Sequence, residues 1–248
     1  MKLQEIFDQL TYGELSNLSI GGGAAGVISE AAWPRVLAHI NLGLTALYKR
    51  FNLKEGRITV ELQPGQFIYS LNSLYAVTRL GSSEAVRYIK DTTANPFKDD
   101  ILKVQSVLTD DGIEFPLNDT SNCYSINTPS STVISVPKDV VNSSAELPEE
   151  LETDNLEIVY RANHPKLVIP VGYYDPTRVT VQLPDTHLQA LLFFVAMRAN
   201  APIGMREEFN ASNNFAAKYE AECVQLETSG MQVDQGAQNT RMERGGWV

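Results

Sequence analysis

Residues 34–62 read PRVLAHINLGLTALYKRFNLKEGRITVEL, and the spacing of the apolar residues changes within this stretch. In its first part they recur every three or four positions, which predicts a helix with one buried stripe: Leu37, Ile40, Leu44, Leu47 and Phe51. Pro34 suits a first helical turn, while Lys49 and Arg50 suit a last turn, where cations complement the helix dipole. From Glu55 the period becomes two, as in a half-buried strand. The chain is therefore expected to change from helix to strand near residue 54.

Helical spacing recurs at both ends of the chain. Near the start, apolar residues occupy positions 3, 6, 7 and 10. Near the other end, Leu183-Pro184-Asp185 is expected to begin a helix, and a last helix carries Phe215, Tyr219, Cys223 and Leu226. We predict an α+β protein in which the N- and C-terminal segments form an antiparallel helical bundle. The expected divisions are residues 1–54 and 183–230 for the bundle, 55–182 for an inserted antiparallel β-rich region, and 231–248 for an extended C-terminal tail.

Short strands with turn residues between them fill the predicted insertion. Gln63-Pro64-Gly65-Gln66 is a turn that would pair residues 57–62 with residues 67–69. Asp110-Asp111-Gly112 would turn the strand 101–108 into residues 113–115, since aspartate and glycine accept the backbone angles of tight turns. Two further strands are predicted at residues 132–136 and 156–160.

The composition excludes several classes of protein. Of the 248 residues, 43% are hydrophobic and 20% charged, which excludes global disorder. The formal charge of −10 argues against a protein that grips DNA or anionic membranes with its whole surface. The most apolar stretch, Leu188–Met197, is about half the length that a bilayer span needs, and Met1–Leu10 contains no apolar run of a secretory signal. Cys123 and Cys223 lie far apart and are expected to be free, buried thiols in a reducing compartment.

The patterns that could indicate catalysis or cofactor binding lack the context that their chemistry requires. Gly21, Gly23 and Gly26 match G-x-G-x-x-G, but a poor strand precedes them and no acidic residue follows about 20 positions later, so a helix–helix connector is the better interpretation. The segment 145–157 holds six carboxylates without any basic or histidine residue, which favours a solvated loop over a metal site. We therefore assign no catalytic, cofactor-binding or metal-binding residues.

The three histidines are also interpreted as structural. His39 lies beside the apolar stripe of the helix that follows Pro34, His164 precedes a proline in a turn, and His187 falls in a first helical turn. None has a second histidine four positions later, as a zinc-hydrolase helix would. His39 is expected to be a core or interface residue.

The tail differs in character from the rest of the chain. Residues 231–248 are polar and contain glycine, and they finish on Arg241-Met242-Glu243-Arg244-Gly245-Gly246-Trp247-Val248. A tryptophan in such a segment has no evident role in a core, whereas tryptophan and arginine are the residues that interfaces use as anchors. The tail is therefore a candidate binding segment, the alternative being a disordered extension.

From about residue 30 to 230, the order of elements resembles the head-to-tail adaptor (connector) proteins of tailed bacteriophages, above all those of the short-tailed type. The resemblance follows the residues in chain order. It begins with a helix through Ile40-Asn41-Leu42-Gly43-Leu44 to Tyr48-Lys49-Arg50-Phe51, followed by strands around Leu62-Gln63-Pro64-Gly65 to Tyr69 and a strand Leu156-Glu157-Ile158-Val159-Tyr160-Arg161. It ends with a helix from Leu183-Pro184 through Met197 and Ala199 and a last helix with Lys218-Tyr219-Glu220-Ala221-Glu222-Cys223. The β insertion is larger than that of the smallest adaptors.

The resemblance implies a virion structural protein and not an enzyme. Such adaptors form a dodecameric ring between the portal protein and the tail or nozzle proteins, at the head–tail junction of a virion assembled in the host cytoplasm. DNA passes through the lumen without specific binding, and an acidic wall would suit that passage. The C-terminal segment of these adaptors grips the portal, a role that would fall here to Arg241, Arg244, Trp247 and Val248. No cofactor and no membrane are implied.

Two alternatives remain open. The chain could be another tail, nozzle or head-completion component, or it could be a soluble intracellular enzyme with a helical bundle and a β insertion. An enzyme would be a monomer or dimer with a polar pocket holding histidine or paired carboxylates, whereas an adaptor would form a ring.

Overall fold

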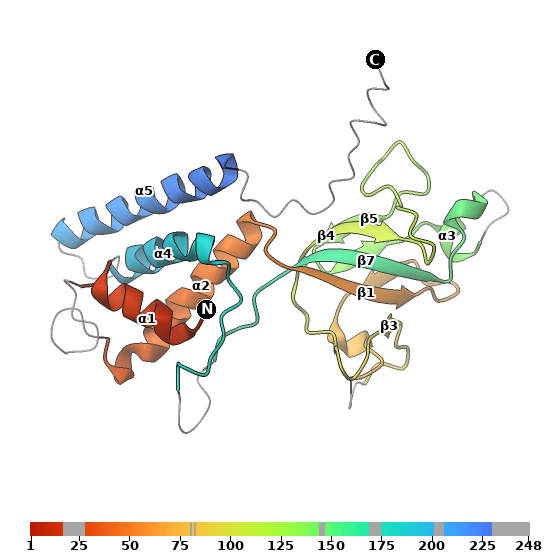
Figure 1. Cartoon of the computed structure of the whole chain (residues 1–248). Coiled ribbons are helices and arrows are strands. Elements are labelled where there is room, and N and C mark those ends of the chain that lie inside the picture. Colours follow the sequence, from red (N-terminus) through yellow and green to blue (C-terminus); the bar gives the residue numbers. More distant parts are fainter. Residues whose placement is uncertain are drawn as a thin grey trace, which may run out of the picture. The chain divides into compact units, whose positions relative to one another are not determined.

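The computed structural model describes residues 1–16, 28–79, 81, 83–143, 147–168, 175–200 and 206–229. The chain is an α+β protein with two compact units, one built from residues 1–53 together with the residues from 164 onward, and the other from Lys54–Asn163. The first unit is helical and the second contains two antiparallel sheets (Figure 1). Both ends of the chain therefore contribute to one unit, and the β unit is an insertion within it.

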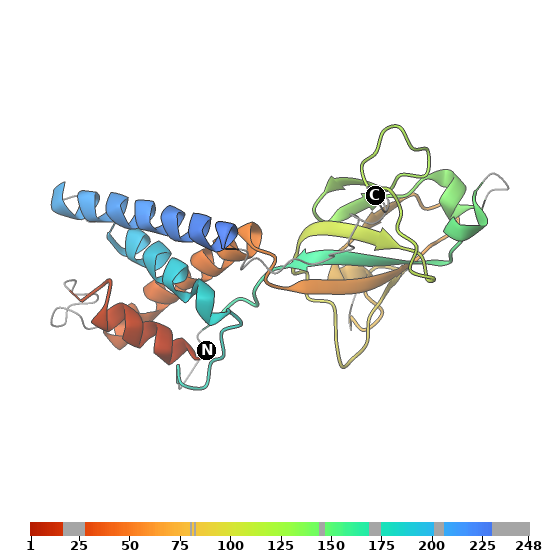
Figure 2. The same cartoon turned by 45° about the horizontal axis from the view of Figure 1, so that its top comes forward.

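The helical unit consists of α1 (Leu3–Tyr12), α2 (Trp33–Arg50), α4 (Leu188–Asn200) and α5 (Arg206–Thr228). Helix α4 packs against the other three and lies between α5 and α2 in both views (Figures 1 and 2). Its buried residues point in several directions around the helix, as expected of a central helix: Ala190, Leu191, Leu192, Val195, Ala196 and Ala199.

Helix α2 begins and ends as the sequence predicts, with proline in its first turn and Lys49 and Arg50 in its last. Gly43 lies on the stripe that faces α4, and a Cβ atom there would come within 2.6 Å of Leu191 Cδ1. The missing side chain therefore lets the two helices approach closely. Arg50 also donates hydrogen bonds to Glu227 at 2.6 Å and Glu220 at 2.7 Å, which joins the end of α2 to α5.

The segment after residue 163 belongs to the helical unit, although the sequence analysis placed residues up to 182 in the β insertion. The amide of Asn41 on α2 both accepts from Leu167 N and donates to Leu167 O, at 2.9 and 2.8 Å. Farther along, Leu3 N donates to Val179 O, and Val181 N donates to Met1 O. The described parts of this segment are held to Met1, α1 and α2 by hydrogen bonds between residues far apart in the chain, so the predicted boundary is corrected from 182 to 163.

The larger sheet of the β unit has four antiparallel strands in the order β3-β1-β7-β4. Its strands are β1 (Glu55–Glu61), β3 (Ile89–Lys90), β4 (Ile101–Leu108) and β7 (Asn155–Ala162). The central pair β1–β7 runs in continuous register from Glu55 opposite Arg161 to Glu61 opposite Asn155. A smaller sheet has the order β2-β6-β5, with β2 (Ile68–Ser70), β5 (Asn127–Ser130) and β6 (Val133–Ser135), and a short helix α3 (Lys138–Val141) follows it.

The predicted pairing of residues 57–62 with 67–69 is wrong. The turn between them forms, with Gly65 at φ +77° and a hydrogen bond from Gln66 N to Gln63 O, but it sends β1 and β2 into different sheets. Strand β2 pairs with β6 instead. The turn at Gly112, by contrast, does fold the chain back after β4, although residues 113–115 form a single bridge rather than a strand.

Side chains from both sheets meet in one core, which includes Ile58, Val60, Tyr69, Tyr88, Val107, Ile134, Leu156 and Ile158.

The acidic segment 145–157 is only partly the solvated loop that was expected. Of its described residues, Leu147 is buried, residues 149–151 form a 3-10 turn, and β7 begins at Asn155.

Five tyrosines are buried among the residues that the structure describes, and burial raises the pKa of each one, to about 12 for Tyr48 and for Tyr88. The stabilisation that follows from a raised pKa is complete below the unfolded value near 10 and is lost as the pH rises toward the folded value.

We therefore expect the free energy of unfolding to fall as the pH rises above about 10. Each tyrosine that keeps its proton only in the folded chain contributes about 1.4 kcal/mol per pH unit. Urea denaturation at a series of alkaline pH values measures the slope, and Tyr48→Phe should reduce it by one tyrosine's share. An unchanged slope in this variant would contradict the raised pKa of Tyr48.

Candidate functional site

A polar groove of about 330 Å³ lies within the β unit, along the edge formed by β1 and β3. Strand β1 and the chain that follows β3 supply most of its wall, and Tyr160 from β7 and Asp100 complete it. The charged side chains that line the groove are Lys54, Glu55, Arg57, Lys90, Asp91, Lys98 and Asp100. Both cations and carboxylates therefore surround this one concavity.

The inner end of the groove depends on a glycine and a tyrosine on neighbouring strands. Gly56 is paired with Tyr160, and a Cβ atom at Gly56 would lie 2.3 Å from the Tyr160 ring. The hydroxyl of Tyr160 donates to Asp100 at 3.0 Å, and Lys54 contacts the other oxygen of Asp100 at 2.9 Å. Burial, followed by the negative charge of Asp100, raises the pKa of Tyr160 well above its usual range. At neutral pH, Tyr160 is thus a hydrogen-bond donor.

The outer wall of the groove is held in shape by part-buried hydrogen bonds. Asp91 accepts from the Thr78 backbone and hydroxyl and from Phe97 N, the last at 3.0 Å. Burial raises the pKa of Asp91, but these hydrogen bonds outweigh it and the pKa is lowered. Asp99, at φ 56°, accepts from both the backbone and the hydroxyl of Ser73. These two carboxylates fasten the wall to the segment 73–78 and are structural groups.

Most cations of the groove already have partners within the chain. Arg57 contacts Glu55 at 3.1 Å and Glu157 at 3.2 Å, and Lys90 contacts Glu61 at 3.0 Å. Lys98 is exposed and has no ion-pair partner among the described residues. Through Lys98, the groove can therefore offer positive charge to an anionic partner. The lining of the groove contains no histidine or cysteine that would serve acid–base or nucleophilic chemistry.

The three histidines all lie in the helical unit and serve its packing. His164 is buried, and its Nε2 accepts from Gln182 N at 3.0 Å. His187 packs edge-on against Phe51, and burial lowers its pKa. His39, expected to be a core or interface residue, is half-buried, and its pKa is lowered by burial and by Arg198 and Arg35.

Of the two cysteines, Cys223 is buried on α5 as predicted, whereas Cys123 is exposed, which corrects the expectation for that residue. The difference follows from position, because the residues around Cys123 form a polar surface loop without an apolar stripe. In the part of the chain that the structure describes, no group of three or more His, Cys, Asp or Glu side chains could hold a metal ion. No helix in that part combines the length and apolarity that crossing a bilayer requires.

Several residues of the sequence analysis lie outside the described residues. They are Gly21, Gly23 and Gly26 of the glycine-rich stretch, and the candidate anchors Arg241, Arg244, Trp247 and Val248. The last described residues before those anchors are the end of α5 and Ser229. The role of the anchors stays a prediction.

No protein-family model matches the chain, and the search of curated proteins found no match either.

The groove was not predicted from sequence, because its parts come from residues more than 100 positions apart. One signal was available: a glycine inside a strand often marks a close approach of another group, and Gly56 marks the Tyr160 ring.

We expect Gly56→Ala to destabilise the β unit by about 1–3 kcal/mol, because the added methyl group would displace the buried Tyr160 ring. Urea denaturation of the single variants and of the double variant with Tyr160→Ala gives a double-mutant cycle. In the Tyr160→Ala background the cost of Gly56→Ala should largely disappear. An equal cost in both backgrounds would show that the ring is not the cause.

Proposed function

We propose that the chain is a virion structural protein, a head-to-tail adaptor that forms a ring between the portal and the tail of a bacteriophage. The observation that carries the proposal is the insertion: the chain leaves the helical unit after residue 53 and returns to it at residue 164. The same order of helix, inserted strands and final helices underlies the resemblance to adaptors. A helical body with one inserted β unit suits a protein that contacts different partners through its different units.

The proposal assigns the helices to the body of the ring, as an antiparallel bundle. Its support is the packing of α4 against α1, α2 and α5, with the Arg50 hydrogen bonds to α5. A helix that is buried on several sides would form the packed core of such a ring body. In this proposal the β unit reaches toward the tail or nozzle proteins.

The tail is proposed to grip the portal. Residues 231–248 follow α5 closely in the chain, so the packed end of α5 would anchor them to the ring body. Trp247 would fill a pocket of the portal, while Arg241 and Arg244 would pair with its carboxylates. Val248 would add a small apolar contact.

The net charge of −10 suits a DNA conduit, because an acidic lumen would repel phosphates and leave the DNA free to move. A tail, nozzle or head-completion component remains the nearest alternative. In the groove of the β unit, which the enzyme alternative could use, Lys54, Asp100 and Tyr160 already bond to one another.

The test mixes the full chain with the portal protein encoded in the same genome and images the complex by negative-stain electron microscopy. We expect a ring with a central hole on the portal. Trp247→Ala should weaken portal binding by about 2 kcal/mol or more, roughly thirtyfold, because buried tryptophans are typical hot spots. Deletion of residues 231–248 should abolish binding.

Trp33→Phe provides a matched control, since Trp33 lies in α2, where its ring stacks on Phe7. It should leave portal binding unchanged. Failure of the full chain to bind the portal or to form a ring would overturn the proposed function. Unaltered binding after the deletion would overturn the role of the tail alone.

A further inference from the structure

The polar face of the four-stranded sheet is electrically asymmetric along its strands. Residues paired across the strands share a face, and one row of this face contains Glu55, Arg161 and Lys103 on β1, β7 and β4. Arg57 lies on the same face, two residues along β1, and Lys54 and Lys98 lie at the same end, in the groove. We call Lys54, Arg57, Lys98, Lys103 and Arg161 the basic end.

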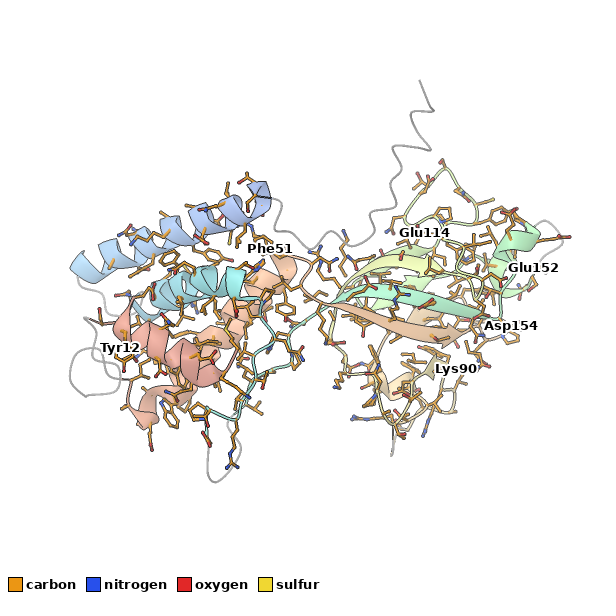
Figure 3. The ribbon with its side chains drawn as sticks, viewed as in Figure 1. Tyr12, Phe51, Lys90, Glu114, Glu152 and Asp154 are labelled. Carbon is orange, nitrogen blue, oxygen red and sulfur yellow. The ribbon has the colours of Figure 1, made fainter. Side chains whose placement is uncertain are left out.

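The other end of the same sheet is acidic. Asp110 lies beside the start of β7, because Asn155 Nδ2 donates to its carboxylate at 3.1 Å and Thr153 bonds to it as well. Glu152 and Asp154 immediately precede β7, and Figure 3 shows both at this end of the sheet. We call Asp110, Asp111, Glu149, Glu150, Glu152 and Asp154 the acidic end.

The basic end is partly neutralised within its own unit, because Lys54 pairs with Asp100 and Arg57 pairs with Glu55 and Glu157. Lys103 on β4 lies opposite Arg161 on β7 in register. Lys98 and Lys103 are exposed, and no ion pair of either is found among the described residues. All six carboxylates of the acidic end are exposed. Lys90, on the edge strand β3, is already paired with Glu61.

We propose that the acidic end of one copy of this chain docks against the basic end and groove of the next copy. The partner is a second copy because this chain carries both halves of the complementary pair, at opposite ends of one sheet. Contact between two different surfaces is heterologous, and heterologous contacts generate rings when the rotation closes. The inference rests on the proposed function, since it supplies one subunit contact of that ring.

The charge balance explains why such a contact would be specific. Copies with a formal charge of −10 repel each other in most orientations, so only an orientation that brings acidic to basic surface is favoured. Because the groups are exposed, salt should weaken the contact.

A carbodiimide, which joins an amine to a carboxylate in direct contact, tests the proposal on the full chain. Copies labelled with nitrogen-15 are mixed with unlabelled copies, so that mass spectrometry separates links between copies from links within one. We expect mixed-isotope links from Lys54, Lys98 or Lys103 to the glutamates of the acidic end. Their absence at the highest soluble concentration and low salt, both alone and in the complex with the portal, would overturn the proposal.

Charge reversal supplies the variants. K98E/K103E and E150K/E152K should each reduce the yield of these links at least tenfold, because each places like charges opposite one another. The quadruple variant that carries all four changes restores complementarity and should restore association. Its links should join the amines introduced at positions 150 and 152 of one copy to the carboxylates introduced at positions 98 and 103 of the next.

A matched control makes the same change in net charge at a different place on the chain. K166E/K218E has the same net charge as K98E/K103E but alters exposed lysines of the helical unit, and it should leave the links intact. Equal loss of links in K166E/K218E would show that net charge alone is responsible, which contradicts the proposal.

The outcomes separate this inference from the proposed function. A ring on the portal that forms equally well with K98E/K103E would overturn the sheet contact and leave the adaptor function standing. Links between copies without any portal binding would support the contact and overturn the adaptor function.

Discussion

The pairing of β1 with β7 is the interaction on which the rest of the structure depends. These two strands are separated by more than 90 residues, yet they pair without interruption along the whole of β1. Closing such a long loop costs conformational entropy, which the continuous ladder and the core beneath it offset. At its end, Ala162 N donates to Lys54 O at 2.9 Å, so the points where the chain leaves and re-enters the β unit are neighbours. Both ends of the chain can therefore build one helical unit.

The features that were predicted correctly are those whose signal is local. Helix α2 and strand β1 were recognised because each has a regular period within its own residues. Strand β2 was assigned to the wrong partner, since its true partner β6 begins more than 60 residues later and a turn signal does not show which strand lies beside it. The segment 164–183 has no period, and its hydrogen bonds to Met1, Leu3 and Asn41 cannot be read from its own residues.

In the candidate site, too, some features have a local signal in the sequence and others depend on residues far apart in the chain. The separate charges of the groove are visible in the sequence, but their arrangement depends on the register that brings Gly56 beside Tyr160. The charge asymmetry of the sheet also arises from register, because the acidic stretch before β7 and the lysines near β4 acquire opposite positions only when the strands align. The sequence alone showed that acidic residues gather around residue 150, which is one half of a complementary pair.

The close approach of Lys54 and Ala162 has a consequence for the evolution of the chain. An insertion whose two ends meet at one hydrogen-bonded point can be lengthened, shortened or exchanged without moving the helices on either side of the junction. The helical unit can thus be retained while the inserted unit changes in length and sequence.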